Sequence, residues 1–221
     1  MTSPDNHVRI SCIVPAAGSS RRMGCPKAAL PFGGSTVAGT VVRSLLRAGA
    51  DEILVVTRRE LAAHLDLPPG PAITVAFNDD PNSEMIDSVR IALAFLQSRA
   101  GEHRVSPGAS GAIDNLPPRF AATGILVVPA DMPAITVESY RKCLDSFHRD
   151  PGRIVIAAYQ GKSGHPIVFP ISLAADVGRL TGGLREMIHA NSERVILAET
   201  NDPGVLRDVD TRADYERMNQ R

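Results

Sequence analysis

Cysteine is scarce in this sequence, with three residues among 221. Cys12, Cys25 and Cys143 form an odd set without C-x-x-C spacing, which argues against both a disulfide framework and structural zinc. Cys25 has no adjacent base in the sequence, so we do not expect it to act as a nucleophile. Sparse cysteine of this kind is typical of a cytoplasmic protein.

Long apolar runs and an excess of one charge are also missing. No apolar run approaches the roughly 20 residues that cross a bilayer, and residues 1–9 lack the apolar core of a signal peptide. Lysine and arginine number 24, as do aspartate and glutamate, so the formal net charge is zero. We therefore expect a cytoplasmic protein with no nucleic-acid or membrane partner.

The composition is that of a globular chain, with 43% hydrophobic and 22% charged residues, long enough for one large domain or two small ones. Strand and helix patterns alternate along it. The expected strands cover residues 10–15, 51–57, 72–77, 124–128, 153–159, 161–169, 194–198 and 207–209. The expected helices cover residues 36–48, 59–65, 84–99, 136–148, 171–178, 184–190 and 211–218.

The strand patterns predict an α/β fold. Strands such as I-L-V-V-T lack polar alternation, so we expect a mostly parallel sheet covered by helices on both faces, a three-layer Rossmann-like arrangement. The helix over 84–99 should pack through an apolar stripe of Met85, Val89, Ala92, Leu93 and Leu96. Ligands bind outside the carboxyl ends of strands in such folds. The loops after the first and fourth strands should therefore meet at one edge.

Residues 101–120 interrupt this rhythm, because they are rich in Gly, Pro, Ser and Ala and have no periodicity. A structureless stretch of this length is unusual inside a compact domain. We interpret it as a flexible surface insertion, with a functional lid as the alternative.

The loop after the first strand concentrates glycine, serine and cationic side chains over residues 15–27. Glycine lets backbone N–H groups converge on anionic oxygens, and cations neutralise the remaining charge, so this composition predicts a polyphosphate site. Two common phosphate loops do not fit. G-x-G-x-x-G is absent, because Gly18 and Gly24 have no glycine between them, and Lys27 follows Pro26 rather than the glycine of a P-loop.

The pattern that remains is A-A-G-x-S-x-R-M-G-x-x-K, and further motifs follow it in order. They are Asn78, Met85, Ser88-Val89-Arg90, Val128 to Pro133, Gly164-His165-Pro166, and Val209-Asp210-Thr211. With these motifs the chain resembles the MobA-like NTP-transferase family over most of its length, and most closely the branch of molybdenum cofactor cytidylyltransferases. The resemblance implies a single nucleotidyltransferase domain over residues 1–221 with the Rossmann-like nucleotidyltransferase fold.

The resemblance also implies the chemistry and the site. An acceptor oxygen attacks the α-phosphorus of an NTP and pyrophosphate leaves, with Mg²⁺ as the cofactor. The implied catalytic residues are Arg22, Lys27 and Asp131, and the implied metal ligands are Asp131 and Asp210. Nucleotide binding falls on Ala16, Ala17, Gly18, Ser19, Ser20, Arg22, Gly24, Lys27, Asn78 and Ser88, and acceptor binding on Gly164, His165 and Pro166. Asp208 is expected to be a solvated neighbour.

The implied partners are CTP or another NTP, molybdopterin as a phosphorylated acceptor, and a molybdenum hydroxylase. Ala17 stands where the guanylyl branch has glycine, which favours CTP over GTP. Three departures weaken the acceptor assignment. Glu84 replaces a glycine of the family pattern, Gly182-Gly183-Leu184-Arg185 is a shortened form of its G-D-x-G-A-R segment, and the loop over residues 101–120 is longer than the family pattern implies. Three alternatives stay open, namely transfer to a sugar or polyol phosphate, a non-catalytic cofactor chaperone, and an oxidoreductase.

Overall fold

The computed structural model describes residues 8–18, 23–101, 122–179 and 181–220. Seven strands form its main sheet in the order β5-β4-β1-β6-β8-β7-β9. They are β1 (Ile10–Pro15), β4 (Glu52–Thr57), β5 (Ile73–Phe77), β6 (Gly124–Val127), β7 (Ile154–Tyr159), β8 (Lys162–Pro170) and β9 (Val195–Thr200). Only β8 among these runs against its neighbours, β6 and β7. The prediction of a mostly parallel sheet is confirmed.

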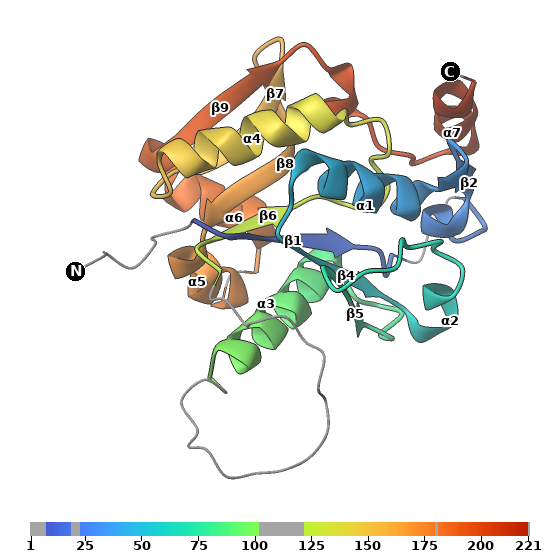
Figure 1. Cartoon of the computed structure of the whole chain (residues 1–221), viewed down its shortest axis with the longest axis horizontal. Coiled ribbons are helices and arrows are strands. Elements are labelled where there is room, and N and C mark those ends of the chain that lie inside the picture. The colour runs from blue at the N-terminus through green and yellow to red at the C-terminus, as the bar shows by residue number, and fades with distance from the viewer. Residues whose placement is uncertain (1–7, 19–22, 102–121, 180, 221) are drawn as a thin grey trace.

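Helices cover both faces of this sheet (Figure 1). On one face, α1 (Val37–Ala48) and α4 (Val137–Arg149) bury Val41, Leu45, Tyr140 and Phe147 against Cys12 and Val14 of β1. On the other face, α3 (Met85–Gly101), α5 (Ala174–Arg179) and α6 (Gly183–Ala190) pack on Ile13, Leu54 and Ile125. The three-layer α/β fold is thus confirmed, with strands such as β1 buried on both faces because helices lie on each side.

The helix termini follow from local side-chain chemistry. Thr36 accepts a hydrogen bond from the Gly39 N–H at the start of α1, and Thr136 accepts one from Ser139 N–H at the start of α4. The last helix, α7 (Arg212–Asn219), begins with a reciprocal capping box between Thr211 and Asp214. Each cap satisfies backbone N–H groups that a helix start leaves without intrahelical partners.

Short elements complete the described chain. A hairpin of β2 (Pro31–Phe32) and β3 (Ser35–Thr36) precedes α1, and α2 (Arg59–Ala62) follows β4. Single 3-10 turns are η1 (Lys27–Ala29), η3 (Ile171–Leu173), η4 (Ser192–Arg194) and η5 (Pro203–Leu206). No described helix is both long and apolar enough to cross a membrane.

Three sequence predictions about elements need correction. Residues 207–209 form no strand: within the described residues, the one backbone hydrogen bond from them toward the sheet edge runs from the Val209 N–H to the Asp131 carbonyl. The short strand expected within 161–169 is instead the nine-residue β8. Met85 is exposed rather than in the apolar stripe of α3, where Ile86 is buried in its place. Residues 102–120 of the expected insertion lie outside the described residues.

Candidate active site

A cavity of about 330 Å³ opens at the carboxyl edge of the parallel strands. Besides Leu61 of α2, four segments form its walls. They are the loop after β1 (Ala16, Ala17, Gly18, Met23, Pro26, Lys27), the first part of α3 with the residues before it (Ser83, Glu84, Met85, Ser88), the exit of β6 (Pro129, Ala130, Asp131), and Asp210. The cavity therefore lies at the sheet edge where the sequence predicted a ligand site, as expected for this architecture.

The loop after β1 is fixed at both of its described ends. The Ala16 N–H donates to the Val56 carbonyl at 2.7 Å, which continues the ladder beyond the strand. Gly24 adopts the left-handed conformation with φ +66°, which residues with a side chain rarely adopt. The chain then turns into η1, so that the side chain of Lys27 joins the wall of the cavity.

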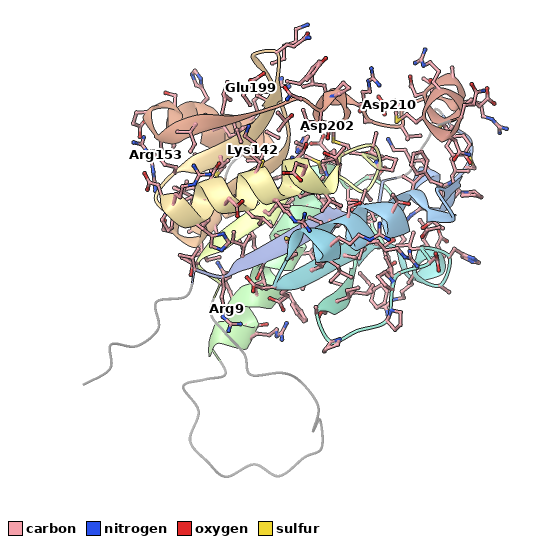
Figure 2. The ribbon with its side chains drawn as sticks, turned by 45° about the horizontal axis from the view of Figure 1, so that its top comes forward. Arg9, Lys142, Arg153, Glu199, Asp202 and Asp210 are labelled. Atoms are coloured by element: carbon pink, nitrogen blue, oxygen red, sulfur yellow. The ribbon has the colours of Figure 1, made fainter. Side chains whose placement is uncertain are left out.

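Three carboxylates meet at the mouth of this cavity. Asp131, Asp208 and Asp210 can each place one oxygen within 4.8 Å of the others. The Ala130 N–H donates to the Pro15 carbonyl at 3.0 Å, and the Val209 N–H donates to the Asp131 carbonyl at 2.8 Å. These two bonds bring segments far apart in sequence to the same place, and Figure 2 shows Asp210 on the stretch that leads into α7.

Lys27 is ion-paired to two of these carboxylates. Its Nζ lies 2.5 Å from Asp131 Oδ2 and 3.1 Å from Asp210 Oδ1. Burial opposes the charged form of Lys27, but the charges and hydrogen bonds of Asp131 and Asp210 outweigh burial and raise its pKa. Lys27 is therefore a stable cation inside the acidic cluster.

The third carboxylate, Asp208, is exposed but electrostatically part of the cluster. Desolvation and the negative charges of Asp210 and Asp131 raise the pKa of Asp208. Such mutual repulsion among carboxylates is relieved when a cation binds. The donor set also fits a hard divalent cation, because Mg²⁺ prefers carboxylate and other oxygen ligands, and an ammonium already lies between two of these oxygen donors.

The expected nucleotide residues Asn78 and Ser88 are brought together, in direct contact with each other. The Asn78 amide donates to Ser88 Oγ at 3.1 Å, and both residues are buried. Ser88 lines the cavity, whereas Asn78 is not part of its lining. Asn78 thus positions the Ser88 hydroxyl through this hydrogen bond without itself lining the cavity.

The segment containing the expected acceptor residues lies on β8, beyond the lining of the cavity. The Nδ1 atom of His165 is buried and has no hydrogen-bond partner among the described residues. Burial lowers the pKa of His165, against a hydrogen bond to the Val127 backbone and the charge of Asp131. Pro166 is buried, and Gly164 packs on η5, where a Cβ would lie 2.0 Å from the Val205 carbonyl oxygen.

Comparison with known proteins identifies the family of this chain. Residues 12–195 match the family described as "MobA-like NTP transferase domain". The chain belongs to this family. The sequence prediction of family and enzyme class is confirmed.

Individual relatives of this MobA-like transferase carry mixed names. Molybdenum cofactor cytidylyltransferase of Escherichia coli (strain K12) is 26% identical over 208 residues, which cover 93% of each chain. Nicotine blue oxidoreductase of Paenarthrobacter nicotinovorans is 27% identical over 216 residues, covering 91% of this chain and 92% of that protein. The structure of Rv0371c from Mycobacterium tuberculosis H37Rv superposes with a TM-score of 0.73 at 26% identity, over 97% of this chain and 99% of that one. A second structure of Rv0371c is a complex with manganese.

The structure of this MobA-like transferase unites most of the expected site, with one addition. Ala16, Ala17, Gly18, Lys27, Ser88, Asp131 and Asp210 all line the cavity. Ser19, Ser20 and Arg22 lie outside the described residues. Asp208 was missed as a cluster member, although D-V-D spacing is a usable signal: a buried Val209 between two aspartates puts both carboxylates on the opposite side of an extended segment.

Proposed function

We propose that this nucleotidyltransferase transfers CMP from CTP to the phosphate group of molybdopterin and releases pyrophosphate. The observation that carries the proposal is the acidic cluster with Lys27 at the end of the cavity that begins at Ala17 and Gly18. The name of the Escherichia coli relative supports both CTP and the molybdenum cofactor as substrates.

In the proposed reaction, an acceptor phosphate oxygen forms a bond to the α-phosphorus of CTP. The bond from that phosphorus to the β-phosphate oxygen breaks, and the electron pair leaves with pyrophosphate. The backbone around Gly18 and Gly24 binds the β- and γ-phosphates, and Arg22 offsets their charge. Catalysis then depends on positioning and on charge neutralisation rather than on covalent chemistry by the protein.

Asp131 and Asp210 are the proposed ligands of Mg²⁺, with Asp208 as a third carboxylate within reach. When bound, the divalent cation supplies charge neutralisation at the reacting phosphates. Lys27 is proposed to neutralise charge on the triphosphate and on the departing pyrophosphate. His165, Gly164 and Pro166 are proposed to border the acceptor, from the strand that lies beside β6.

Ala17 is proposed to favour a pyrimidine. It is 5% exposed and lines the cavity directly before Gly18. A methyl group there narrows the space available to the base, compared with the glycine of the guanylyl branch. CTP should therefore turn over faster than GTP, and the Ala17→Gly variant should narrow that difference.

The test is pyrophosphate release from CTP, GTP, ATP and UTP with a panel of acceptors that contains molybdopterin, molybdenum cofactor, sugar phosphates and polyol phosphates. The proposal expects the highest rate with CTP and a molybdopterin acceptor. Highest turnover with GTP would refute the base assignment, and highest turnover with a sugar or polyol phosphate would refute the acceptor assignment. Oxidation of NAD(P)H or a bound chromophore would instead support the oxidoreductase suggested by the name of one relative.

Replacement of Asp131 distinguishes an enzyme from a cofactor chaperone. We expect Asp131→Asn to lower pyrophosphate release by about 10²-fold or more, because the variant removes a charge that the transition state needs. The matched control is Asp145→Asn, an exposed aspartate of α4. A chaperone would keep cofactor binding and delivery in the Asp131→Asn protein and would release no pyrophosphate in either form.

A further inference from the structure

The side chain of Lys27 lies among the oxygens that are proposed to bind the metal. Its ammonium makes ion pairs of 2.5 Å with Asp131 and 3.1 Å with Asp210. The three side chains are only 19%, 18% and 32% exposed, so solvent screens these pairs less than it screens surface pairs. This is the arrangement of a counter-ion within a partly buried anionic site.

An ammonium and a divalent cation compete for the same carboxylate oxygens. Both need close contact with the oxygen lone pairs, and two cations at such distances repel each other. With Lys27 in place the cluster has a formal charge of −2, from three carboxylates and one ammonium. Withdrawal of the ammonium exposes the full charge of −3 to an incoming cation. The Lys27 contact therefore reduces both the space and the charge available to a metal ion.

A triphosphate offers Lys27 another anionic partner. Gly18 and Lys27 line the same cavity. The ammonium can therefore reach phosphates bound by the loop and still remain inside the cavity. The four-carbon stem of lysine rotates freely enough for such an exchange. Before the triphosphate arrives, the carboxylates are the anions that Lys27 is known to contact.

We propose that Lys27 is a built-in counter-ion of the metal site, which gives up Asp131 and Asp210 to a divalent cation and transfers its ammonium to the triphosphate. Bound nucleotide then raises the affinity for the metal ion, and bound metal raises the affinity for the nucleotide. Without nucleotide, the protein binds the metal ion weakly. This inference rests on the proposed metal and triphosphate sites. It concerns the order and coupling of binding, which nucleotidyl transfer by itself does not require.

The test measures metal binding in the absence of nucleotide and acceptor. Mn²⁺ is titrated into the protein, and free Mn²⁺ is followed by electron paramagnetic resonance. Lys27→Met keeps the length of the side chain and removes its charge. We expect it to bind Mn²⁺ at least about fivefold more tightly than the wild type, at the lower end of typical coupling factors. Equal or weaker Mn²⁺ binding by Lys27→Met overturns the proposal.

Two matched variants isolate the cause. Lys27→Arg keeps the cation and should leave Mn²⁺ affinity near the wild-type value. Lys142→Met removes the same charge from the exposed surface of α4, well away from Asp210 (Figure 2), and should also leave Mn²⁺ affinity unchanged. If Lys142→Met tightens binding as much as Lys27→Met does, the effect belongs to net charge and the counter-ion role is refuted.

A measurement on the wild-type protein tests the proposal even if a Lys27 variant folds poorly. Acetic anhydride acetylates uncharged amines, and mass spectrometry gives the rate at each lysine. At saturating Mn²⁺ without nucleotide, displacement from the carboxylates should speed acetylation of Lys27 severalfold while Lys142 stays constant. An unchanged Lys27 rate overturns the proposal.

These readouts separate the inference from the proposed function. If the protein releases pyrophosphate but Lys27→Met does not change Mn²⁺ binding, the proposed function stands and the counter-ion role of Lys27 is refuted. If Lys27→Met tightens Mn²⁺ binding but the protein transfers no nucleotide, the counter-ion role stands and the proposed reaction is refuted.

Discussion

The backbone N–H of Val209 donates a 2.8 Å hydrogen bond to the carbonyl oxygen of Asp131. The Val209 side chain is fully buried, and Asp208 and Asp210 flank it in the acidic cluster. A single buried valine thus anchors two carboxylates beside the third. The geometry of the cluster depends on packing at a residue that itself has no polar side chain.

We expect Val209→Ala to weaken metal binding as well as stability. Loss of buried methyl groups should cost about 1–3 kcal/mol of unfolding free energy, and a looser segment should lower Mn²⁺ affinity severalfold. Urea unfolding and Mn²⁺ titration measure the two effects. Val177→Ala, at a fully buried position of α5 that does not line the cavity, should lose similar stability and keep its Mn²⁺ affinity. Equal losses of affinity in both variants would remove the anchoring role.

Glu84 places a carboxylate in the cavity wall, where the family pattern has glycine. A negative side chain there repels a triphosphate, by an amount of order 1 kcal/mol at high dielectric. Glu84→Gln and Glu84→Gly should therefore lower the KM for CTP about two- to tenfold with little change in kcat, and the gain should shrink at high salt. Glu193→Gln, at an exposed glutamate outside the cavity, is the control. A higher KM in Glu84→Gln would show that the carboxylate helps to bind the nucleotide.

Gly164 lets β8 approach η5 closely. An added Cβ would lie 2.0 Å from the Val205 carbonyl oxygen and 2.9 Å from Leu206 Cδ2, so Gly164→Ala must push the two segments apart. We expect a loss of about 1–3 kcal/mol in thermal or urea unfolding. Gly178→Ala is the matched control, because nothing lies within 4 Å of its added Cβ. Unchanged stability in Gly164→Ala would show that η5 moves without cost.

Burial lowers the pKa of His165 below its ordinary value of 6.5, against the opposing effects of the Val127 backbone and Asp131. The unfolded chain therefore takes up a proton as pH falls through about 6.5, while the folded protein still holds the imidazole neutral. Stability is full above this pH and is lost as pH falls below it. We expect His165→Gln to flatten the pH dependence of urea unfolding between pH 7.5 and about 5.5, measured with EDTA. The exposed His64, changed to glutamine, is the control and should leave that slope intact; a slope that persists in His165→Gln would contradict the assignment.

The layers of the fold, and the sheet edge at which the loop after β1 lies, could be predicted from the sequence alone. Runs such as I-L-V-V-T specify strands buried on both faces, because polar groups on either face would have no partner in the packed interior. The positions of Gly18, Lys27 and Asp131 after such strands were enough to predict that they share one edge, which the cavity confirms.

The arrangement of the acidic cluster depends on tertiary contacts. The two-residue turn Gln160-Gly161 makes β8 antiparallel to β7, but the pairing of β8 with β6, more than 30 residues earlier in the chain, depends on tertiary packing. Asp208 joins Asp131 because Val209 is buried and bonded to a residue distant in sequence. The Lys27 ammonium likewise lies between two carboxylates from separate segments. Local propensity and periodicity report on neighbours along the chain, whereas charge pairing and close packing depend on which distant segments meet.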